Sequence, residues 1–179
     1  MPSYSIIENF EVHKNNRFLE IAESLKPELR HKEIKAAKEI MVGKDRQMRT
    51  VITEEYPIEN LYAKSLKRDD TVFVDFGDHA VGYVTLELSK TGSHQDAPVY
   101  FYLKFGERLE EMTDKTADYD GWLSRGWIQE EYIHVDVLPA KVKLPRRYSF
   151  RYMELRVIDT SAKFQLKING ISCDTVSAV

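Results

Sequence analysis

Carboxylate and aromatic side chains are concentrated in one stretch of the sequence, between Glu107 and Trp127. The residues there that could do chemistry are Asp118, Tyr119, Asp120, Trp122, Arg125 and Trp127. Aromatic rings stack on the apolar CH faces of pyranose sugars, while carboxylates and guanidinium groups hydrogen-bond to hydroxyls. This composition predicts a carbohydrate-binding loop. The alternative interpretation is that Trp127 packs under the loop, with Tyr100 and Tyr102 filling an interface between sheets.

Two other kinds of chemistry were considered for the same stretch. A glycosidase needs two carboxyl groups roughly 5–10 Å apart, one of them protonated. Since a solvated loop explains the acidic residues more simply, we expect no catalytic residue here. The carboxylate oxygens of Asp114, Asp118 and Asp120 are of the type that binds Ca²⁺, which leaves a Ca²⁺ site open as an alternative. Their spacing matches no known calcium-binding loop. The five histidines match no zinc spacing, so no metal site or cofactor is predicted.

A basic segment, Leu144–Asp159, lies further along the chain. Its second half alternates, with Met153, Leu155 and Val157 on one side, which predicts a strand with one face in a core. Arginine and carboxylate groups form bidentate, geometrically specific pairs. We therefore expect Arg147 and Arg151 each to form a structural ion pair with an acidic residue of a neighbouring strand. The candidate acids are Asp75, Glu107 and Glu131.

Alternating segments surround both clusters and must position them. Strands are predicted over residues 72–77, 82–89, 99–106, 127–138 and 164–171, with an extended segment from Cys173 onward. A hairpin-type turn is expected at Asp78–Ala80. Roughly seven or eight strands without intervening helices are typical of an antiparallel β-sandwich or jelly roll. The predicted fold is mostly β, galactose-binding-like, with a short N-terminal helical arm.

The arm is predicted to cover residues 1–69 and the sandwich residues 70–179. Asn15 and Asn16 can cap a helix in which Phe18, Ile21, Ala22 and Leu25 share one face. A second helical pattern runs from Ile34 to Met41 and stops at Gly43, with a strand over residues 39–42 as the alternative. Residues 1–14 form a lead-in or an edge strand, and residues 49–53 have the β-branched content of a strand.

Composition narrows the classes of partner and location. The net charge of −3 gives no basic field for nucleic acid. The single cysteine, Cys173, cannot form an intrachain disulfide and is expected to be a buried thiol. The N-terminus lacks a cationic start followed by an apolar run, and no stretch approaches the roughly 20 apolar residues of a spanning helix. We therefore predict a cytoplasmic, soluble protein without a membrane partner.

Five short motifs, taken in order, resemble a known family. They are Val74–Gly77 with Val81–Tyr83, Leu103–Glu107, Trp127–Glu131, Leu144–Tyr148 and Phe150–Tyr152. Together they are similar to the β-sandwich domain that precedes the catalytic barrel in bacterial α-L-rhamnosidase-like glycoside hydrolases. The resemblance covers about residues 70–179. The family usually has glycine where Ser149 stands here.

The resemblance implies a function. In that family the catalytic carboxylates lie in an (α/α) barrel C-terminal to the sandwich. The chain is therefore expected to be a non-catalytic accessory domain of a glycoside hydrolase, with the C-terminal catalytic domain of the same polypeptide as its partner and glycan as a second contact. The alternatives are a free-standing carbohydrate-binding module and a ligand-free protein-interaction domain.

Overall fold

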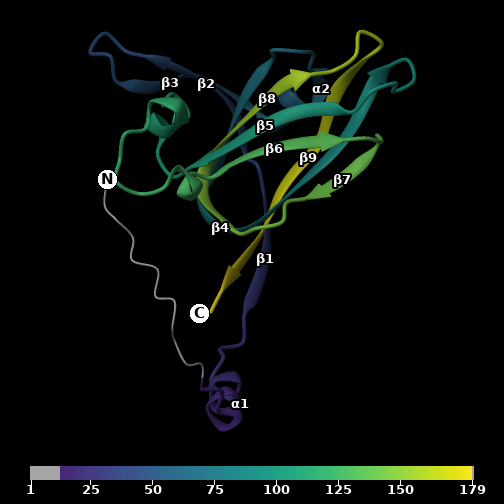
Figure 1. Ribbon diagram of the computed structural model, residues 1–179. Helices are drawn as coiled ribbons and strands as arrows, with labels where there is room; N and C mark the ends of the chain where they lie inside the picture. Colours follow the sequence, from purple (N-terminus) through teal and green to yellow (C-terminus); the bar gives the residue numbers. More distant parts are fainter. Residues whose placement is uncertain (1–12, 179) are drawn as a thin grey trace.

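Nine strands and two α-helices are found in residues 13–178, the part of the chain that the computed structural model describes (Figure 1). The helices are α1 (Asn16–Ser24) and α2 (Ile58–Ala63). The strands are β1 (Arg30–Lys35), β2 (Lys38–Lys44), β3 (Thr50–Pro57), β4 (Thr71–Gly92), β5 (Val99–Gly106), β6 (Glu130–Val135), β7 (Ala140–Lys143), β8 (Tyr148–Asp159) and β9 (Phe164–Ser177).

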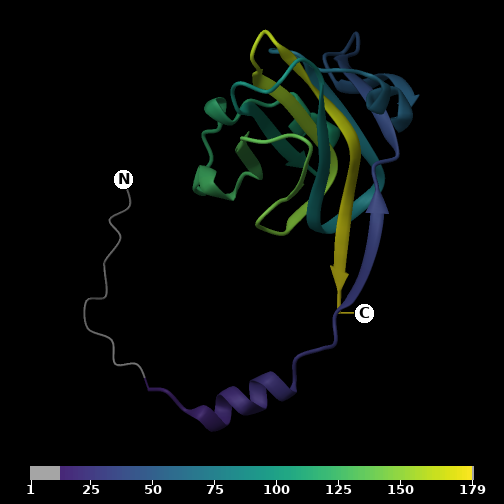
Figure 2. The same ribbon diagram turned by 90° about the vertical axis from the view of Figure 1, so that its right-hand side faces the viewer.

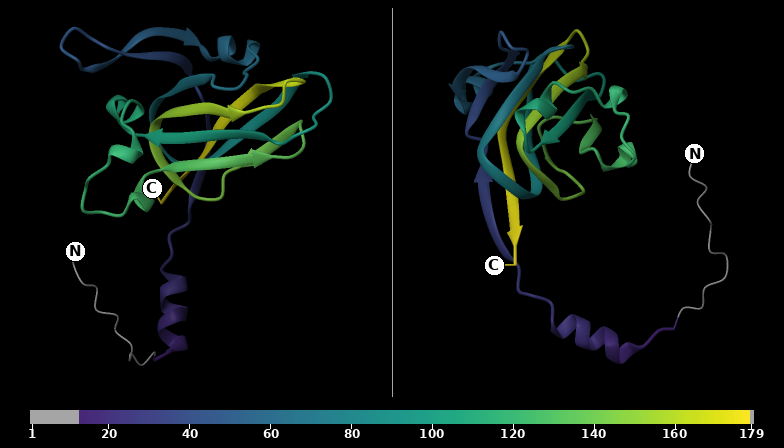
Figure 3. Two further views of the ribbon diagram at one scale, coloured as in Figure 1. Left: turned by 45° about the horizontal axis from the view of Figure 1, so that its top comes forward. Right: turned by 90° about the vertical axis from the view of Figure 1, so that its left-hand side faces the viewer.

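The strands form two layers that share β4. In one layer, residues 71–75 of β4 lie between β2 and β8; β3 lies outside β2, and β5 and β6 follow β8. In the other layer, residues 82–92 of β4 pair with β9, which pairs with β1, and β7 pairs with residues 85–88. All of these pairs are antiparallel. Figure 3 shows β8, β5 and β6 side by side in front of β9. The predicted mostly-β antiparallel sandwich is confirmed.

The hairpin predicted at Asp78–Ala80 is wrong. Residues 71–92 form one continuous strand that passes from the first layer to the second, and its two halves do not pair with each other. Gly77 has a φ of +85°, a conformation that side chains with a Cβ rarely adopt, and it lies where the ladder with β8 is irregular. At Gly82 a Cβ would lie 2.1 Å from the carbonyl oxygen of Asp174, so glycine lets β9 approach.

The core lies between the layers and follows the alternation of the strands. Val99, Phe101, Leu103 and Phe105 of β5 are all buried in it. In β8 the buried set changes parity. Tyr148 and Phe150 face the core first, and Met153, Leu155 and Val157 do so afterwards, opposite the irregular part of β4. The predicted alternation of residues 153–157 is confirmed, and the change of parity turns Arg151 away from the core.

The N-terminal segment contains more strands than predicted. Helix α1 is confirmed, with the Asn15 side chain accepting a hydrogen bond from the backbone of Arg17. The second helix, over residues 34–41, is wrong, because that segment is the end of β1 and the start of β2, as in the alternative interpretation. These strands pair with β9 and β4, and β3 contains residues 50–53 of the strand predicted at residues 49–53. The division at residue 69/70 stays a prediction, and most of the lead-in, residues 1–12, lies outside the described residues.

The C-terminal strand, β9, contains the single cysteine of the chain. Cys173 is fully buried as predicted, and burial raises the pKa of its thiol to about 11, with the Asp174 carboxylate adding to the shift. The extended segment continues through Ser177. Within residues 13–178, no helix has both the length and the apolar character needed to cross a membrane.

Candidate functional site

Residues 107–129 connect β5 to β6 and form the segment we call the β5–β6 loop. It contains three short 3-10 helices, η1 (Leu109–Met112), η2 (Thr116–Asp118) and η3 (Arg125–Trp127). Trp127 therefore precedes β6, which is shorter at both ends than the predicted strand over residues 127–138.

A few contacts hold the loop against the outer face of β5. Met112 is buried against Ile40 and Tyr152 in a second, smaller apolar cluster. Lys104, itself a buried residue of β5, donates a hydrogen bond to the carbonyl oxygen of Asp114. Glu130, at the start of β6, accepts hydrogen bonds from Thr116 and from the Tyr102 hydroxyl, the latter at 2.6 Å. Burial and the adjacent Glu130 carboxylate together raise the pKa of Tyr102.

Beneath the loop lies a pocket of about 640 Å³, a size typical of small-molecule sites. Three of the six predicted sugar-binding residues, Asp118, Tyr119 and Trp127, line it. Trp127 remains 74% exposed, so its ring is accessible from solvent. The other lining residues are Lys104, Phe105, Glu111, Thr113, Asp114, Lys115, Thr116, Leu123, Ser124, Ile128 and Gln129.

The other three predicted residues do not line the pocket. Trp122 is 92% exposed. Arg125 donates hydrogen bonds to the carbonyl oxygens of Ala117 at 3.2 Å and Tyr119 at 3.1 Å, so it holds the two sides of the loop together. Asp120 lies between Tyr119 and Gly121 at the exposed tip of the loop. Trp127 does not pack under the loop as a buried residue, which was the alternative interpretation.

Sequence reasoning missed several lining residues. Lys104 falls on the outward face of β5, and a lysine between Leu103 and Phe105 was a weak signal of a buried polar contact. Gln129 is uncharged and not aromatic, so composition gave no reason to select it. Leu123 and Ile128 supply apolar surface, which a search for polar chemistry does not select.

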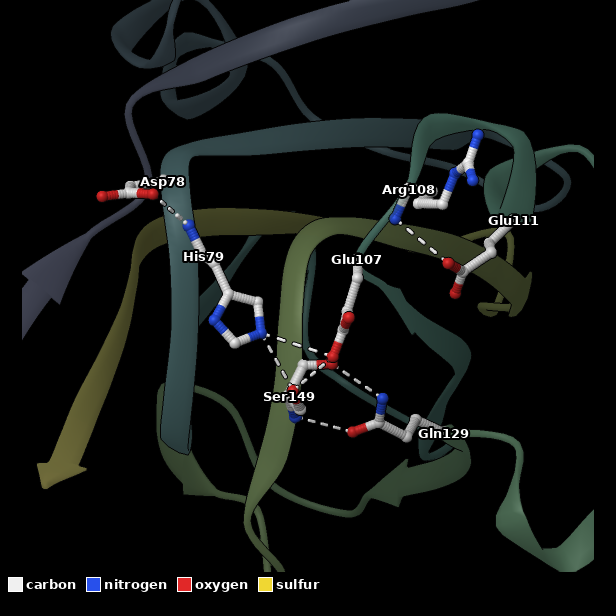
Figure 4. Close-up of polar contacts among 7 residues, drawn as sticks. All are labelled: Asp78, His79, Glu107, Arg108, Glu111, Gln129 and Ser149. Carbon is white, nitrogen blue, oxygen red and sulfur yellow. Dashed lines mark hydrogen bonds and ion pairs between the residues drawn. The ribbon is translucent and has the colours of Figure 1, made fainter.

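Next to the pocket, His79, Glu107 and Ser149 form a polar cluster at the molecular surface (Figure 4). They come from the middle of β4, the residue after β5 and the start of β8. His79 Nε2 lies 3.0 Å from Ser149 Oγ and 3.3 Å from Glu107 Oε1. The Ser149 hydroxyl donates to the same Glu107 oxygen at 2.5 Å. The Ser149 and His79 hydrogen bonds lower the pKa of Glu107.

Gln129 joins this cluster to the pocket. Its side-chain amide donates to the Ser149 carbonyl oxygen at 2.8 Å and accepts from the Ser149 N–H at 2.7 Å, as Figure 4 shows. Because Gln129 also lines the pocket, the wall of the pocket is fixed to β8. Gln129 is therefore the residue that links the cluster to the pocket.

The cluster is not arranged as a hydrolytic triad. In a triad one imidazole nitrogen takes the serine proton while the other donates to the carboxylate. Here one nitrogen of His79 faces both Ser149 and Glu107, and the hydroxyl donates directly to the carboxylate. This geometry does not activate Ser149 as a nucleophile, and it suits hydrogen bonding to a polar ligand.

The ion pairs predicted for β8 fall into two groups. Arg151 and Asp75 form a bidentate pair, with Nε and Nη2 each 2.9 Å from a carboxylate oxygen. Burial alone would raise the pKa of Asp75, but hydrogen bonds from Arg151 and the Gly77 N–H outweigh it and lower that pKa. The Asp75 side chain is only 4% exposed, so this pair is partly buried at the bend of β4.

The second predicted arginine is placed differently. Arg147 is exposed and has no ion pair within residues 13–178. Its neighbour Arg146 contacts Glu131 instead, at 2.6 Å, and the same Glu131 oxygen accepts from the Tyr148 hydroxyl at 2.7 Å. Glu107 contacts His79 and Ser149 and does not meet either arginine in a described ion pair.

In the described part of the chain, no three His, Cys, Asp or Glu side chains gather as metal ligands would. The sequence predicts no metal site and leaves Ca²⁺ open at Asp114, Asp118 and Asp120, and this interpretation stays a prediction.

The fold and the loop pocket together define the class: a β-sandwich domain with a ligand-sized surface pocket. Residues 38–175 match the family model described as the glycosyl hydrolase family 78 alpha-rhamnosidase N-terminal domain. The match spans most of the chain, and the chain belongs to this family. A search among curated proteins found no match.

A solved structure extends this result. The chain is similar to a rhamnosidase from Klebsiella oxytoca with rhamnose bound, with a TM-score of 0.87 and 34% sequence identity. The similarity covers 93% of this chain and 33% of that chain. This chain therefore spans about a third of the length of that rhamnosidase.

Proposed function

We propose that the chain is a non-catalytic accessory domain of an α-L-rhamnosidase-like glycoside hydrolase, which supports a C-terminal catalytic barrel. The observation that carries the proposal is the match of nearly the whole chain to only a third of a rhamnosidase. The resemblance of the motifs adds that bond cleavage in this family belongs to a barrel after the sandwich. The geometry of His79, Glu107 and Ser149, which does not activate a nucleophile, supports a non-catalytic role.

Hydrolysis by the purified chain tests the first part of the proposal. We expect no turnover of an aryl α-L-rhamnoside above the rate without protein, whereas the Klebsiella oxytoca rhamnosidase serves as the positive control. Turnover that increases in proportion to the concentration of this chain would overturn the proposal.

We further propose that the domain contacts glycan through the pocket beneath the β5–β6 loop. Trp127 and Tyr119 offer aromatic faces for a sugar ring, and Asp118 and Gln129 lie beside them to bond hydroxyls. Three carboxylates and two lysines line the pocket, namely Glu111, Asp114, Asp118, Lys104 and Lys115. This balance favours a neutral sugar over an acidic one.

Tryptophan fluorescence can test sugar binding because the two tryptophans have different positions. We expect rhamnose or a rhamnose-containing oligosaccharide to change the emission of the chain, with galactose as the comparison sugar. Trp127→Ala should abolish the response. Trp122→Ala is the matched control and should retain it, since Trp122 is in the same loop but outside the pocket. No response in the unaltered chain, or equal loss in both variants, would remove the glycan proposal.

Two other proposals remain from the sequence. A cytoplasmic location is supported by the single, buried thiol of Cys173, and cell fractionation tests it. A free-standing carbohydrate-binding module is the runner-up function, and the same pocket favours it. The two functions predict polypeptides of different size in the cell, which immunoblotting with an antibody against the sandwich measures. An accessory domain predicts a band much larger than 179 residues, and a free-standing module predicts a band of about that size.

A further inference from the structure

Helix α1 stands apart from the two layers, at the end of an extended ribbon formed by β1 and the last part of β9 (Figure 2). None of its residues is buried. In the helix Phe18 is 69% exposed, and Leu19 and Ile21 are exposed as well; Leu25, the C-cap residue directly after it, is 75% exposed. The helix therefore presents large apolar side chains to solvent.

The length of α1 shows that its apolar face needs a partner. It has nine residues, whereas isolated helices shorter than about 12–15 residues are marginal in water. The Asn15 cap adds only a local contribution. Phe18, Ile21, Ala22 and Leu25 recur at positions i, i+3, i+4 and i+7, which is the spacing of helices that lie in an apolar groove of a partner.

The comparison with the solved rhamnosidase points to the partner. A match over 93% of the chain leaves about 13 of its 179 residues unmatched, fewer than the 29 residues that precede β1. The similarity therefore extends into the segment that contains α1. In that rhamnosidase two-thirds of the polypeptide lies outside the match, so a large surface is available to cover such a helix.

The positions of the chain ends agree with this partner. Arg30, the first residue of β1, pairs with Ser177 at the end of β9. In a polypeptide that continues beyond β9, the following region departs at the same end of the molecule as α1 (Figure 2). A covalent connection of this kind gives a high effective concentration, so a contact as small as one short helix suffices.

We propose that α1 is a docking helix whose apolar face, Phe18, Ile21, Ala22 and Leu25, packs into a groove of the C-terminal catalytic region of the same rhamnosidase polypeptide. This inference rests on the proposed accessory function. A second copy of the chain is a weaker partner, because stable interfaces use roughly 20–30 residues on each side and α1 supplies nine.

A chimera tests the docking of α1. Residues 1–179 replace the matching third of the Klebsiella oxytoca rhamnosidase, and the variant carries Phe18→Ser with Leu25→Ser. We expect the variant to lose rhamnosidase activity on heating at least about tenfold faster, which corresponds to about 1.4 kcal/mol. Met48→Ser is the matched control, since Met48 is also an exposed apolar residue, 73% exposed, at the turn between β2 and β3. Equal rates for the double variant and the control would overturn the proposal.

Amide hydrogen exchange gives a readout that does not require activity. In the isolated chain the α1 amides should exchange at nearly unfolded rates at every protein concentration, and Phe18→Ser with Leu25→Ser should leave the melting temperature unchanged. In the chimera the same amides should be protected. Protection in the isolated monomer, protection that grows with a monomer-to-dimer transition, or its absence from the chimera would each overturn the proposal.

The outcomes separate this inference from the proposed function. Rhamnoside turnover by the isolated chain would refute the accessory role, whatever the exchange of α1. Unprotected α1 amides in a chimera that cleaves rhamnosides would refute the docking helix and leave the accessory role intact.

Discussion

The antiparallel ladder between β4 and β8 and the β5–β6 loop are held together in different ways. Val74, Met153 and Leu155 of this ladder are completely buried, and alternation along both strands places them in the core. In the loop only Met112 is buried, with Leu109 packed beside it, and most other contacts are hydrogen bonds, several of them to backbone carbonyl groups. The β4–β8 ladder contributes to stability through burial of apolar surface, whereas the loop leaves Trp127 and its neighbours exposed to solvent.

This difference predicts where substitutions change stability and where they change binding. The largest effect is expected in the β4–β8 ladder. Leu155→Ala should lower the free energy of unfolding by about 2–5 kcal/mol, because a cavity remains in a tightly packed core. Chemical denaturation measures it. Trp122→Ala, in the loop, should stay within about 0.5 kcal/mol of the unaltered chain. Comparable losses at the two positions would break the comparison.

The ion pair at the bend of β4 should give the next largest effect. Arg151→Ala leaves the buried Asp75 carboxylate without its bidentate partner and should cost about 2–3 kcal/mol, less than a fully buried pair because Arg151 is partly exposed. Arg147→Ala is the control from the same segment and should stay within about 0.5 kcal/mol. Urea denaturation of both variants distinguishes a structural pair from a general effect of positive charge.

The dependence of stability on pH sharpens the assignment of that pair. The pKa of Asp75 in the folded protein lies below its ordinary value of 3.8, so its contribution to stability is complete above pH 3.8 and is lost as the pH falls through the folded pKa. The difference in unfolding free energy between the unaltered chain and Arg151→Ala should therefore be constant near neutral pH and narrow below pH 3.8. A difference that widens in acid would contradict this assignment.

The smallest effect on stability is expected at the edge of the loop. Ser149→Ala removes the hydroxyl that donates to Glu107, so the pKa of Glu107 should rise toward its ordinary value. The loss of stability should be at most about 1 kcal/mol, because the cluster is exposed. An NMR titration of the Glu107 carboxyl group measures the shift. Ser89→Ala, on the other layer, should leave that pKa unchanged.

The sequence predicted the strands well where one face is apolar. Alternation identified the buried face of β5 and the second half of β8, since a period of two residues is a local property. It failed at Asp78–Ala80, where two polar residues and a small one look like a turn, but Gly77 instead lets one strand continue into the other layer. It also failed for residues 34–41, where apolar spacing fitted a helix, although pairing with β9 and β4 selects strands.

The candidate site was predicted in part for a related reason. Composition identified Asp118, Tyr119 and Trp127, which line the pocket, together with Trp122 and Arg125, which do not. Their side chains point in directions set by η2, η3 and the carbonyl contacts of Arg125, and none of these follows from residue type. Gln129 and Lys104 belong to the site through contacts between the loop and a strand, which a single sequence does not show.

The unbroken path of β4 has a mechanical consequence. A force applied at the end near β2 is carried along one covalent backbone to the end near β9, without crossing a seam between separate sheets. Because the same backbone is hydrogen-bonded in both layers, separating the layers along β4 requires breaking its hydrogen bonds to β2 and β8 or to β9.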